Sequence, residues 1–250
     1  MRGGPRSAIR LRLLPRTDVS AVRSCDAIAT SSNVALVGEA NPNFWRFAGK
    51  RSADGALHRA AGPRLLAACE DIAPIGNRRC GIGEAVVTPA FDLHAAYVIH
   101  AVAPDSLYGG SQQPWQGSGS KGARAASFED APPLGDATQM LARTYRAILA
   151  GAVNHSVGSV AMPAVGAGIQ GFAPGLTAKV ALGALRAHAA TQTGDGLRVD
   201  VALLDDATFN AWSRTTRAML GLPTSTGPDG VELYDVVDDV SDVSCAAGDA

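Results

Sequence analysis

The sequence has almost no net charge, because 22 lysines and arginines are balanced by 23 aspartates and glutamates among its 250 residues. Such a chain lacks the general attraction to nucleic acid or to an anionic membrane surface that a strongly basic protein has, although local basic patches remain possible. Nucleic acid is therefore not the default partner that we expect.

Cysteine is scarce, and its spacing excludes two common kinds of site. The four cysteines, Cys25, Cys69, Cys80 and Cys245, form no C-x-x-C pair and show no ligand-like spacing with histidine. A zinc site and a disulfide framework are both disfavoured by this pattern. We therefore expect no metal, and a reducing compartment such as the cytoplasm or the nucleus.

Long apolar runs are also missing. No segment approaches the roughly 18 apolar residues that a membrane span needs, and the N-terminus has no continuous apolar segment followed by a cleavage site. We expect a soluble protein without a membrane partner. Residues 1–16 carry five arginines and no acid. This faintly resembles an organelle transit peptide, but "AIRLRLL" at 8–14 alternates like a first strand, which is the interpretation that we favour.

The residues that are present indicate a globular α/β protein. Apolar residues make up 46% of the chain, which is enough to bury a substantial core. Strand-like runs alternate with helical patterns, and this order predicts a three-layer α/β/α sandwich. We expect strands at 8–14, 26–30, 84–88, 96–102, 157–162 and 198–204, and helices at about 54–71, 135–152, 174–190 and 206–220.

Irregular segments divide the chain further. The stretch 38–53 contains "NPNFWRFAGKR", and 105–135 is rich in Gly, Ser and Pro without any period. Both are typical of insertions at the surface. No basic residue follows Arg217, whereas acidic residues accumulate toward the end. We therefore expect one domain over 1–220 and an acidic, mobile tail over 221–250.

A glycine string follows the fifth strand-like run. Residues 166–171 read Gly-Ala-Gly-Ile-Gln-Gly, which is a G-x-G-x-x-G pattern, although an ordinary turn is an alternative. Glycines at this spacing let backbone N–H groups approach anionic oxygens. A dinucleotide-binding unit would place the string after its first strand, with an acidic residue about 20 positions later. Here the string comes late and position 186 is Arg186, so a phosphate loop of another kind is favoured.

Four blocks occur in one order along the chain: "DAIATSSNVALVG", "ADGALHRAAGPRLL", "GEAVVTPAFDLHAAYVIHAVAP" and "AMPAVGAGIQGF". Together they resemble the macrodomain family, of the ADP-ribose-hydrolysing type, and the resemblance covers roughly residues 8–220. It implies a mixed, mostly parallel six-stranded sheet flanked by helices. ADP-ribose would then lie across the carboxyl ends of the strands.

The resemblance also implies which residues bind the ligand. Asp18 in "TDVS" matches the family's Asp that accepts a hydrogen bond from the adenine amino group, and Phe172 matches an aromatic that packs against the distal ribose. The family's usual Ser-Thr pair is Gly166-Ala167 here, which removes two hydroxyls but leaves the backbone donors. The implied diphosphate loop comprises Val165, Gly166, Ala167, Gly168, Ile169, Gln170 and Gly171.

Two further matches carry the implied catalysis. Asn33 matches the second Asn of the family's N-A-A-N motif, which touches the distal ribose, whereas the first Asn is Thr30 here. Asp54 in "ADGALH" matches the Asp that the hydrolases place beside the scissile ribose carbon. The implied activity is removal of ADP-ribose from modified proteins or from O-acetyl-ADP-ribose. A water held by the substrate's diphosphate and by Asp54 would attack, and no cofactor is needed.

Alternatives stay open for the function and for single residues. The atypical connection between Asn33 and Asp54, which lacks the family's run of glycines, motivates a non-catalytic reader of ADP-ribose marks, and a nucleotide-binding dehydrogenase is a weaker third hypothesis. Asp18 and Asn33 are also typical of turns, and Asp54 of a helix N-cap. Phe172 is also typical of the core, and His100, which follows three apolar residues in a strand, is most often a core histidine.

Overall fold

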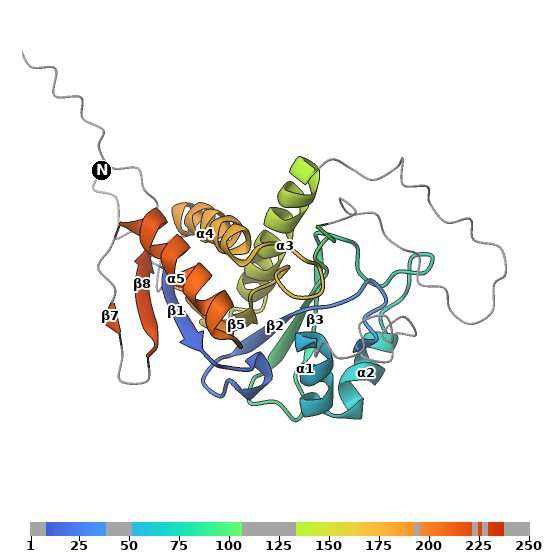
Figure 1. Cartoon of the computed structure of the whole chain (residues 1–250). Helices are drawn as coiled ribbons and strands as arrows, with labels where there is room; N and C mark the ends of the chain where they lie inside the picture. The colour runs from blue at the N-terminus through green and yellow to red at the C-terminus, as the bar shows by residue number, and fades with distance from the viewer. Residues whose placement is uncertain are drawn as a thin grey trace, which may run out of the picture.

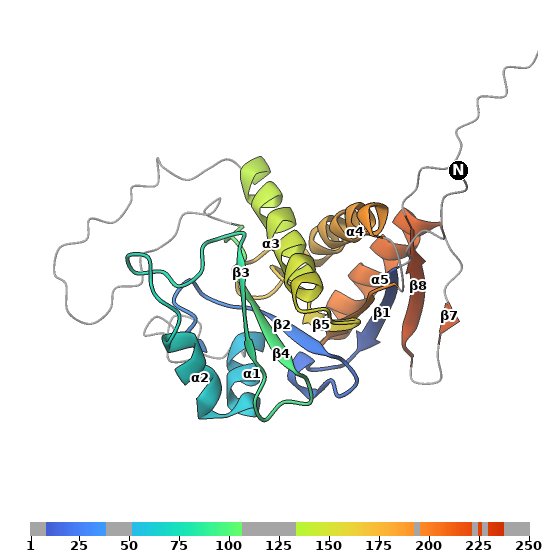
Figure 2. The same ribbon diagram turned by 180° about the vertical axis from the view of Figure 1, so that it is seen from behind.

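The structure is a computed structural model that describes residues 9–38, 52–106, 134–192, 196–221, 225–226 and 230–237. One mixed sheet forms the middle layer, and helices cover both of its faces (Figures 1 and 2), so the predicted three-layer α/β/α architecture is confirmed. Among the described residues, no helix has the length and apolar character needed to cross a membrane.

All six predicted strands are present. They are β1 (Ile9–Pro15), β2 (Ala27–Ser31), β3 (Ala85–Pro89), β4 (Tyr97–Ala101), β5 (Ser159–Pro163) and β6 (Arg198–Leu203). From β4 through β2, β5 and β6 to β1, each neighbouring pair is parallel, whereas β3 runs antiparallel to β4. The central strands are buried along nearly their whole length, because parallel strands covered by helices on both faces need apolar residues at every position.

The sheet has two more strands than the six that we expected. Strands β7 (Ser225–Thr226) and β8 (Glu232–Val236) extend it beyond β1, in the order β3-β4-β2-β5-β6-β1-β8-β7. Burial alternates along β8, with Asp235 facing outward and Tyr234 facing the core. The prediction of a mobile tail from residue 221 is therefore wrong for 232–236, because the acidic composition of this region hid a strand with one buried and one exposed face. Residues 238–250 lie outside the described residues.

The helices agree with the predicted patterns except at one break. They are α1 (Ala53–Ala61), α2 (Pro63–Glu70), α3 (Leu134–Asn154), α4 (Pro174–Thr191) and α5 (Asp206–Leu220), with a short 3₁₀ helix, η1, at Val19–Ala21. The helix expected over 54–71 is two helices. Gly62 has φ = +76°, and Pro63 starts α2 at a position where its missing N–H is not needed.

Two groups of core residues hold the helices on the sheet. Helices α3, α4 and α5 pack on one face, where Leu141 and Trp212 are buried. Helices α1 and α2 and the η1 turn pack on the other through Leu57, Leu65 and Val19. Because β2, β4 and β5 are parallel neighbours, the loops after Ser31, Ala101 and Pro163 meet at one edge of the sheet.

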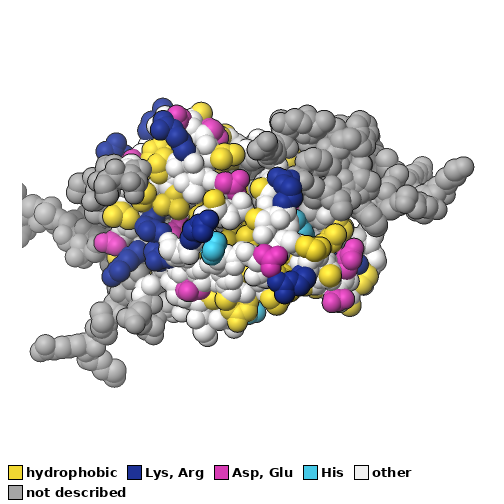
Figure 3. Space-filling model, turned by 90° about the horizontal axis from the view of Figure 1, so that it is seen from below, with side chains coloured by type: hydrophobic (Ala, Val, Ile, Leu, Met, Phe, Trp, Pro, Cys, Tyr) yellow, Lys and Arg dark blue, Asp and Glu magenta, His cyan; other side chains and the backbone are white. Residues whose placement is uncertain are grey.

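The insertions and the surface complete the description. Most of the two predicted insertions, residues 39–51 and 107–133, lies outside the described residues. Basic and acidic side chains are interspersed over the described part of the face seen in Figure 3, in keeping with a formal net charge of −1.

Candidate functional site

The loop from β5 to α4 has a backbone that only glycine suits at two positions. Gly166 has φ = +90° and Gly171 has φ = +75°, in a region that side chains with a Cβ rarely adopt. A Cβ on Gly166 would also lie 2.9 Å from Leu141 Cδ1, and one on Gly171 would lie 2.9 Å from Ser106 Oγ. Gly168 differs, because a Cβ there meets nothing within 4 Å and therefore points into open space.

Some N–H groups of this loop are used internally and others are free. Ala167 N donates to Ala164 O at 2.9 Å, Gly171 N to Gly168 O at 3.1 Å and Phe172 N to Gly166 O at 3.0 Å. In the part of the chain that the structure describes, no hydrogen-bond acceptor is found for the N–H groups of Gly166, Gly168, Ile169 and Gln170. A run of unpaired N–H groups in a loop of this kind is suited to an anion.

Two contacts from distant segments hold the loop, and no motif in the sequence indicates either. The phenol of Tyr145 on α3 donates to Val165 O at 2.9 Å, and burial raises the pKa of Tyr145 above its ordinary value, so the phenol keeps its proton. Ser106 N, after β4, donates to Gln170 O at 2.8 Å. Phe172 is 3% exposed and belongs to the core, so its ring supports the loop from below.

A small pocket lies where the loop meets β2 and α1. Its volume is about 90 Å³, and it is lined by Ser31, Ser52, Ala53, Pro163, Ala164, Gly166, Gly168, Ile169 and Gln170. Pockets that enclose a whole drug-sized ligand measure roughly 300–1,000 Å³. This one therefore accommodates one group of a larger ligand, and the free N–H groups beside it favour a phosphate.

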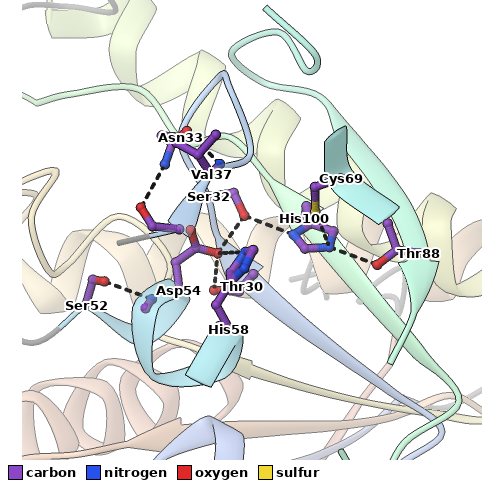
Figure 4. A network of polar contacts seen from close by, with 12 residues as sticks. Thr30, Ser32, Asn33, Val37, Ser52, Asp54, His58, Cys69, Thr88 and His100 are labelled. Carbon is purple, nitrogen blue, oxygen red and sulfur yellow. Dashed lines mark hydrogen bonds and ion pairs between the residues drawn. The ribbon is translucent and has the colours of Figure 1, made fainter. Parts of the chain in front are cut away.

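Asp54 lies in the first turn of α1 and is only 4% exposed. It is not the N-cap, because Ser52 Oγ takes that role by accepting from Gly55 N at 2.9 Å. Instead, Asp54 Oδ1 accepts from Ser32 Oγ at 2.8 Å and from Thr30 Oγ1 at 3.3 Å, both at the end of β2 (Figure 4). His58 Nε2, one turn along α1, is 3.9 Å from the same oxygen.

His100 on β4 lies behind this carboxylate, fully buried as expected of a core histidine. Its Nδ1 is 3.3 Å from Ser32 Oγ, and its Nε2 is 3.0 Å from Thr88 Oγ1 on β3. Burial, with the nearby His58 as a second cause, lowers the pKa of His100 to about 3, so the imidazole is neutral near pH 7.

One cluster contains residue types that zinc prefers, although the cysteine spacing led us to expect no metal. One ligand atom each from His58, Cys69 and His100 lies within 4.8 Å of the other two. Tetrahedral zinc, with bonds of about 2.0 Å to nitrogen and 2.3 Å to sulfur, needs ligand atoms roughly 3.3–3.8 Å apart. His100 Nε2 is already bound to Thr88, and burial raises the pKa of the Cys69 thiol to about 12. We therefore assign no metal to this cluster.

The two remaining predicted residues have local structural roles. Asn33 Oδ1 accepts from Ala35 N at 3.1 Å and Val37 N at 3.3 Å, so it shapes the turn after β2. Asp18 is the N-cap of η1, where its Oδ1 accepts from Ser20 N at 2.9 Å and Ser20 Oγ at 2.7 Å. The turn interpretations of both residues are therefore confirmed. Neither role prevents the residue from contacting a ligand.

The strand order sets the spacing along this edge of the sheet. From β2, which leads to Asn33, the order continues through β5 with its glycine loop and β6 to β1, which leads to Asp18. Three spacings between strands amount to roughly 14 Å. Asp18 and Asn33 thus follow strands on either side of β5, with the glycine loop between them.

Comparisons with known proteins find a matching family model and similar chains. A family model described as Macro domain matches residues 40–116 and 132–181 of the chain, which include Asp54, the glycine loop and Phe172. The chain is 33% identical over 215 residues to a macro domain-containing protein of Ralstonia nicotianae, which is 86% of this chain and 94% of that protein. It is 36% identical over 146 residues to an O-acetyl-ADP-ribose deacetylase of Cronobacter sakazakii, covering 58% of this chain and 66% of that protein.

Among solved structures, the Oceanobacillus iheyensis macrodomain with ADP resembles this chain with a TM-score of 0.61 at 22% identity. The likeness covers 82% of this chain and 88% of that one, and it concerns the fold.

Proposed function

Because the chain belongs to the Macro domain family, we propose that it binds ADP-ribose and hydrolyses the bond that joins ADP-ribose to a modified protein side chain, or deacetylates O-acetyl-ADP-ribose. The observation that carries the proposal is the set of N–H groups of Gly166, Gly168, Ile169 and Gln170, which have no acceptor among the described residues. Their loop follows β5, which lies between the strand that leads to Asn33 and the strand that leads to Asp18. The name of the relative from Cronobacter, an O-acetyl-ADP-ribose deacetylase, supports the second of these activities.

The ligand would extend along the carboxyl edge of the sheet. The diphosphate would accept from the loop N–H groups, which need no side chain for this purpose. The adenine amino group would donate to Asp18, whose carboxylate also caps η1. The distal ribose would then lie toward Asn33 and Asp54. Phe172 would support the loop from the core and make little direct contact, since its ring is almost entirely buried.

Hydrolysis of a modified carboxylate side chain would begin with a water held by Asp54 and by the substrate's diphosphate. The water oxygen would bond to the anomeric carbon of the distal ribose as the bond from that carbon to the side-chain oxygen breaks. The departing carboxylate would keep the bonding electrons, and Asp54 would accept the proton that the water releases. The nearby anions would stabilise the positive charge that develops on the ribose.

Measurements on the unmodified chain test this proposal. Calorimetry with ADP-ribose, NAD and AMP gives the affinities, and single-turnover release from proteins modified on Asp/Glu, on Ser and on Arg gives the activity. We expect ADP-ribose to bind more tightly than NAD, and at least one substrate to be cleaved. Tighter binding of NAD would contradict the proposal and favour a dehydrogenase.

A reader of ADP-ribose marks is the second candidate. It is favoured by the replacement of the family's first motif Asn by Thr30, whose hydroxyl contacts Asp54, and by the atypical connection between Asn33 and Asp54. Binding of ADP-ribose without release from any substrate would favour the reader over the hydrolase.

A further inference from the structure

Two of the three departures from the N-A-A-N motif at the end of β2 contact the same oxygen atom. The chain reads Thr30-Ser31-Ser32-Asn33 there. Residues two apart in an extended segment point to the same side, and Thr30 and Ser32 both point under α1 to Asp54 Oδ1. The motif has alanine at position 32, so the hydroxyl that makes the shorter of these contacts is a feature of this chain.

The proton of Ser32 has one chemically consistent direction. Its Oγ lies 2.8 Å from Asp54 Oδ1 and 3.3 Å from His100 Nδ1. An ionised carboxylate only accepts hydrogen bonds, whereas a hydroxyl has a single proton to donate. If that proton pointed at His100, two oxygen acceptors would face each other at 2.8 Å. Ser32 therefore donates to Asp54, and its lone pairs face His100.

This direction favours one tautomer of His100. For the 3.3 Å contact to be a hydrogen bond, Nδ1 must carry the proton and donate to Ser32 Oγ, which makes Nε2 of the neutral ring an acceptor. A donor is present there, because Thr88 Oγ1 lies 3.0 Å from Nε2, and Cys69 Sγ lies 3.7 Å from the same nitrogen. Thr88, His100 and Ser32 are each at most 4% exposed, so water does not compete for these bonds.

We propose that Thr88, His100 and Ser32 form a one-way hydrogen-bonded chain that ends on Asp54 Oδ1 and positions this carboxylate for the reaction (Figure 4). Ser32 and His100 are positioning residues, since they act through Asp54. Each bond polarises the next in the same direction, which strengthens the final bond to the carboxylate. The catalytic part of this inference rests on the proposed hydrolase function, whereas the direction of the chain does not.

The direction is tested without any substrate. Long-range proton–nitrogen correlation spectra of the folded protein at neutral pH report which imidazole nitrogen of His100 carries the proton. We expect a neutral ring protonated on Nδ1, and replacement of Ser32 by alanine should change the signals of that ring. A ring protonated on Nε2 would overturn the inference, whatever the protein's activity.

The catalytic part is tested by single-turnover release with Ser32→Ala. We expect release to slow by at least about tenfold, equivalent to about 1.4 kcal/mol, with the affinity for ADP-ribose within about twofold of the unmodified protein. Ser32→Thr, which keeps the hydroxyl, should retain more of the rate. Thr88→Val, which removes the first donor and leaves Ser32 and Asp54 intact, should slow release in the same direction and provides a second test if Ser32→Ala does not fold.

Ser213→Ala is the matched control, because Ser213 is also a buried serine whose hydroxyl donates to a buried carboxylate, that of Glu232, at 2.9 Å, but on α5. It should leave the release rate unchanged. Equal rates for Ser32→Ala and Ser213→Ala would overturn the positioning role. If the unmodified protein binds ADP-ribose but cleaves no substrate, the proposed function fails and the positioning role with it, while the tautomer measurement still decides the direction of the chain.

Discussion

At the scale of single residues, the carboxylate of Asp54 combines burial with two hydroxyl donors. A buried carboxylate is unfavourable unless it is hydrogen-bonded, and Ser32 and Thr30 supply such bonds to Oδ1. Rotation of the carboxylate would break both contacts at once. The position of Asp54 is therefore set by β2 as much as by α1, on which Asp54 lies.

Asp54→Ala should slow release of ADP-ribose by about 10²–10⁴-fold, the usual span for a general base, while ADP-ribose affinity changes much less. The carboxylate would act mainly on the transition state, whereas the contacts from Asp18 and the glycine loop also exist in the ground state. Single-turnover release and calorimetry on both proteins check this expectation. An Asp54→Ala protein as active as the parent would remove Asp54 from the mechanism.

Asp18→Ala should weaken ADP-ribose binding by roughly 1.5–3 kcal/mol, the range for a hydrogen bond to a charged group. Ser20→Ala removes the Ser20 Oγ bond to Asp18 but keeps the carboxylate and the capping bond from Ser20 N, so it should keep most of the affinity. Because Asp18→Ala also removes the cap of η1, a ligand without adenine is the control for the cap. Ribose 5-phosphate, which has no adenine, should bind both variants as it binds the parent. Loss of ribose 5-phosphate binding would instead indicate a distorted site.

Stability should fall as the pH is lowered from neutrality because of His100. Its folded-state pKa, about 3, lies below the ordinary value of 6.5. Between these values the unfolded chain binds a proton that the folded protein does not, so stability is full above about pH 6.5 and declines toward pH 3, by up to about 1.4 kcal/mol per pH unit. Denaturant unfolding at pH 7 and pH 5 measures this difference. His100→Gln should reduce the difference in unfolding free energy between the two pH values, whereas His94→Gln, at an exposed histidine, should not. An equal reduction by both substitutions would contradict this role of His100.

At the scale of elements, the glycine loop and its supports illustrate what local sequence encodes. The glycine string at 166–171 predicted a loop whose backbone N–H groups can approach a ligand closely. That prediction was possible because the spacing of glycines is visible in a short stretch of sequence. Tyr145 was not predicted, since its bond to Val165 depends on how α3 packs beside β5. The Ser32–His100 contact likewise depends on the pairing that sets Thr30 opposite His100 across β2 and β4, 70 residues apart in the chain.

Gly168→Glu tests the role of the loop directly. The new side chain would begin in open space, so folding should be unaffected, but its carboxylate would occupy and repel the proposed diphosphate site. We expect ADP-ribose affinity to fall at least ~100-fold, equivalent to about 2.7 kcal/mol. Gly183→Glu is the matched control, because Gly183 is also open to a Cβ and lies exposed on α4. Normal binding by Gly168→Glu in calorimetry would show that this loop does not hold the diphosphate.

At the scale of the whole molecule, the sheet is larger than the sequence pattern indicated. The six predicted strands show either an apolar run or, at 8–14, an alternating pattern, and both are visible in a short stretch of sequence. In contrast, β8 carries acidic residues within a region that is rich in them. Its identity as a strand comes from pairing with β1, between Ile9↔Val236 and Leu13↔Glu232. Pairing between β8 and β1 depends on the tertiary structure, whereas the acidic composition alone predicted a mobile tail.

Removal of β8 should therefore destabilise the protein. A chain that ends at residue 221 would leave β1 with an unpaired edge and expose core residues that Tyr234 and Val236 cover. We expect a lower thermal unfolding midpoint and a tendency to aggregate, measured against a chain that ends at residue 237 and keeps β8. Equal midpoints for the two truncated chains would mean that β8 adds nothing to the stability of the sheet.

The position of β5 between β2 and β6 in the sheet also has a consequence for synthesis on the ribosome. Asp18, Asn33 and Asp54 are all made within the first quarter of the chain, but the loop that would hold the diphosphate follows residue 163. β5 in turn is held by β6, which begins at Arg198. A nascent chain that has not yet emerged past about residue 203 therefore contains Asp18, Asn33 and Asp54 without the loop between them, so a nucleotide would first be captured only after β6 has emerged.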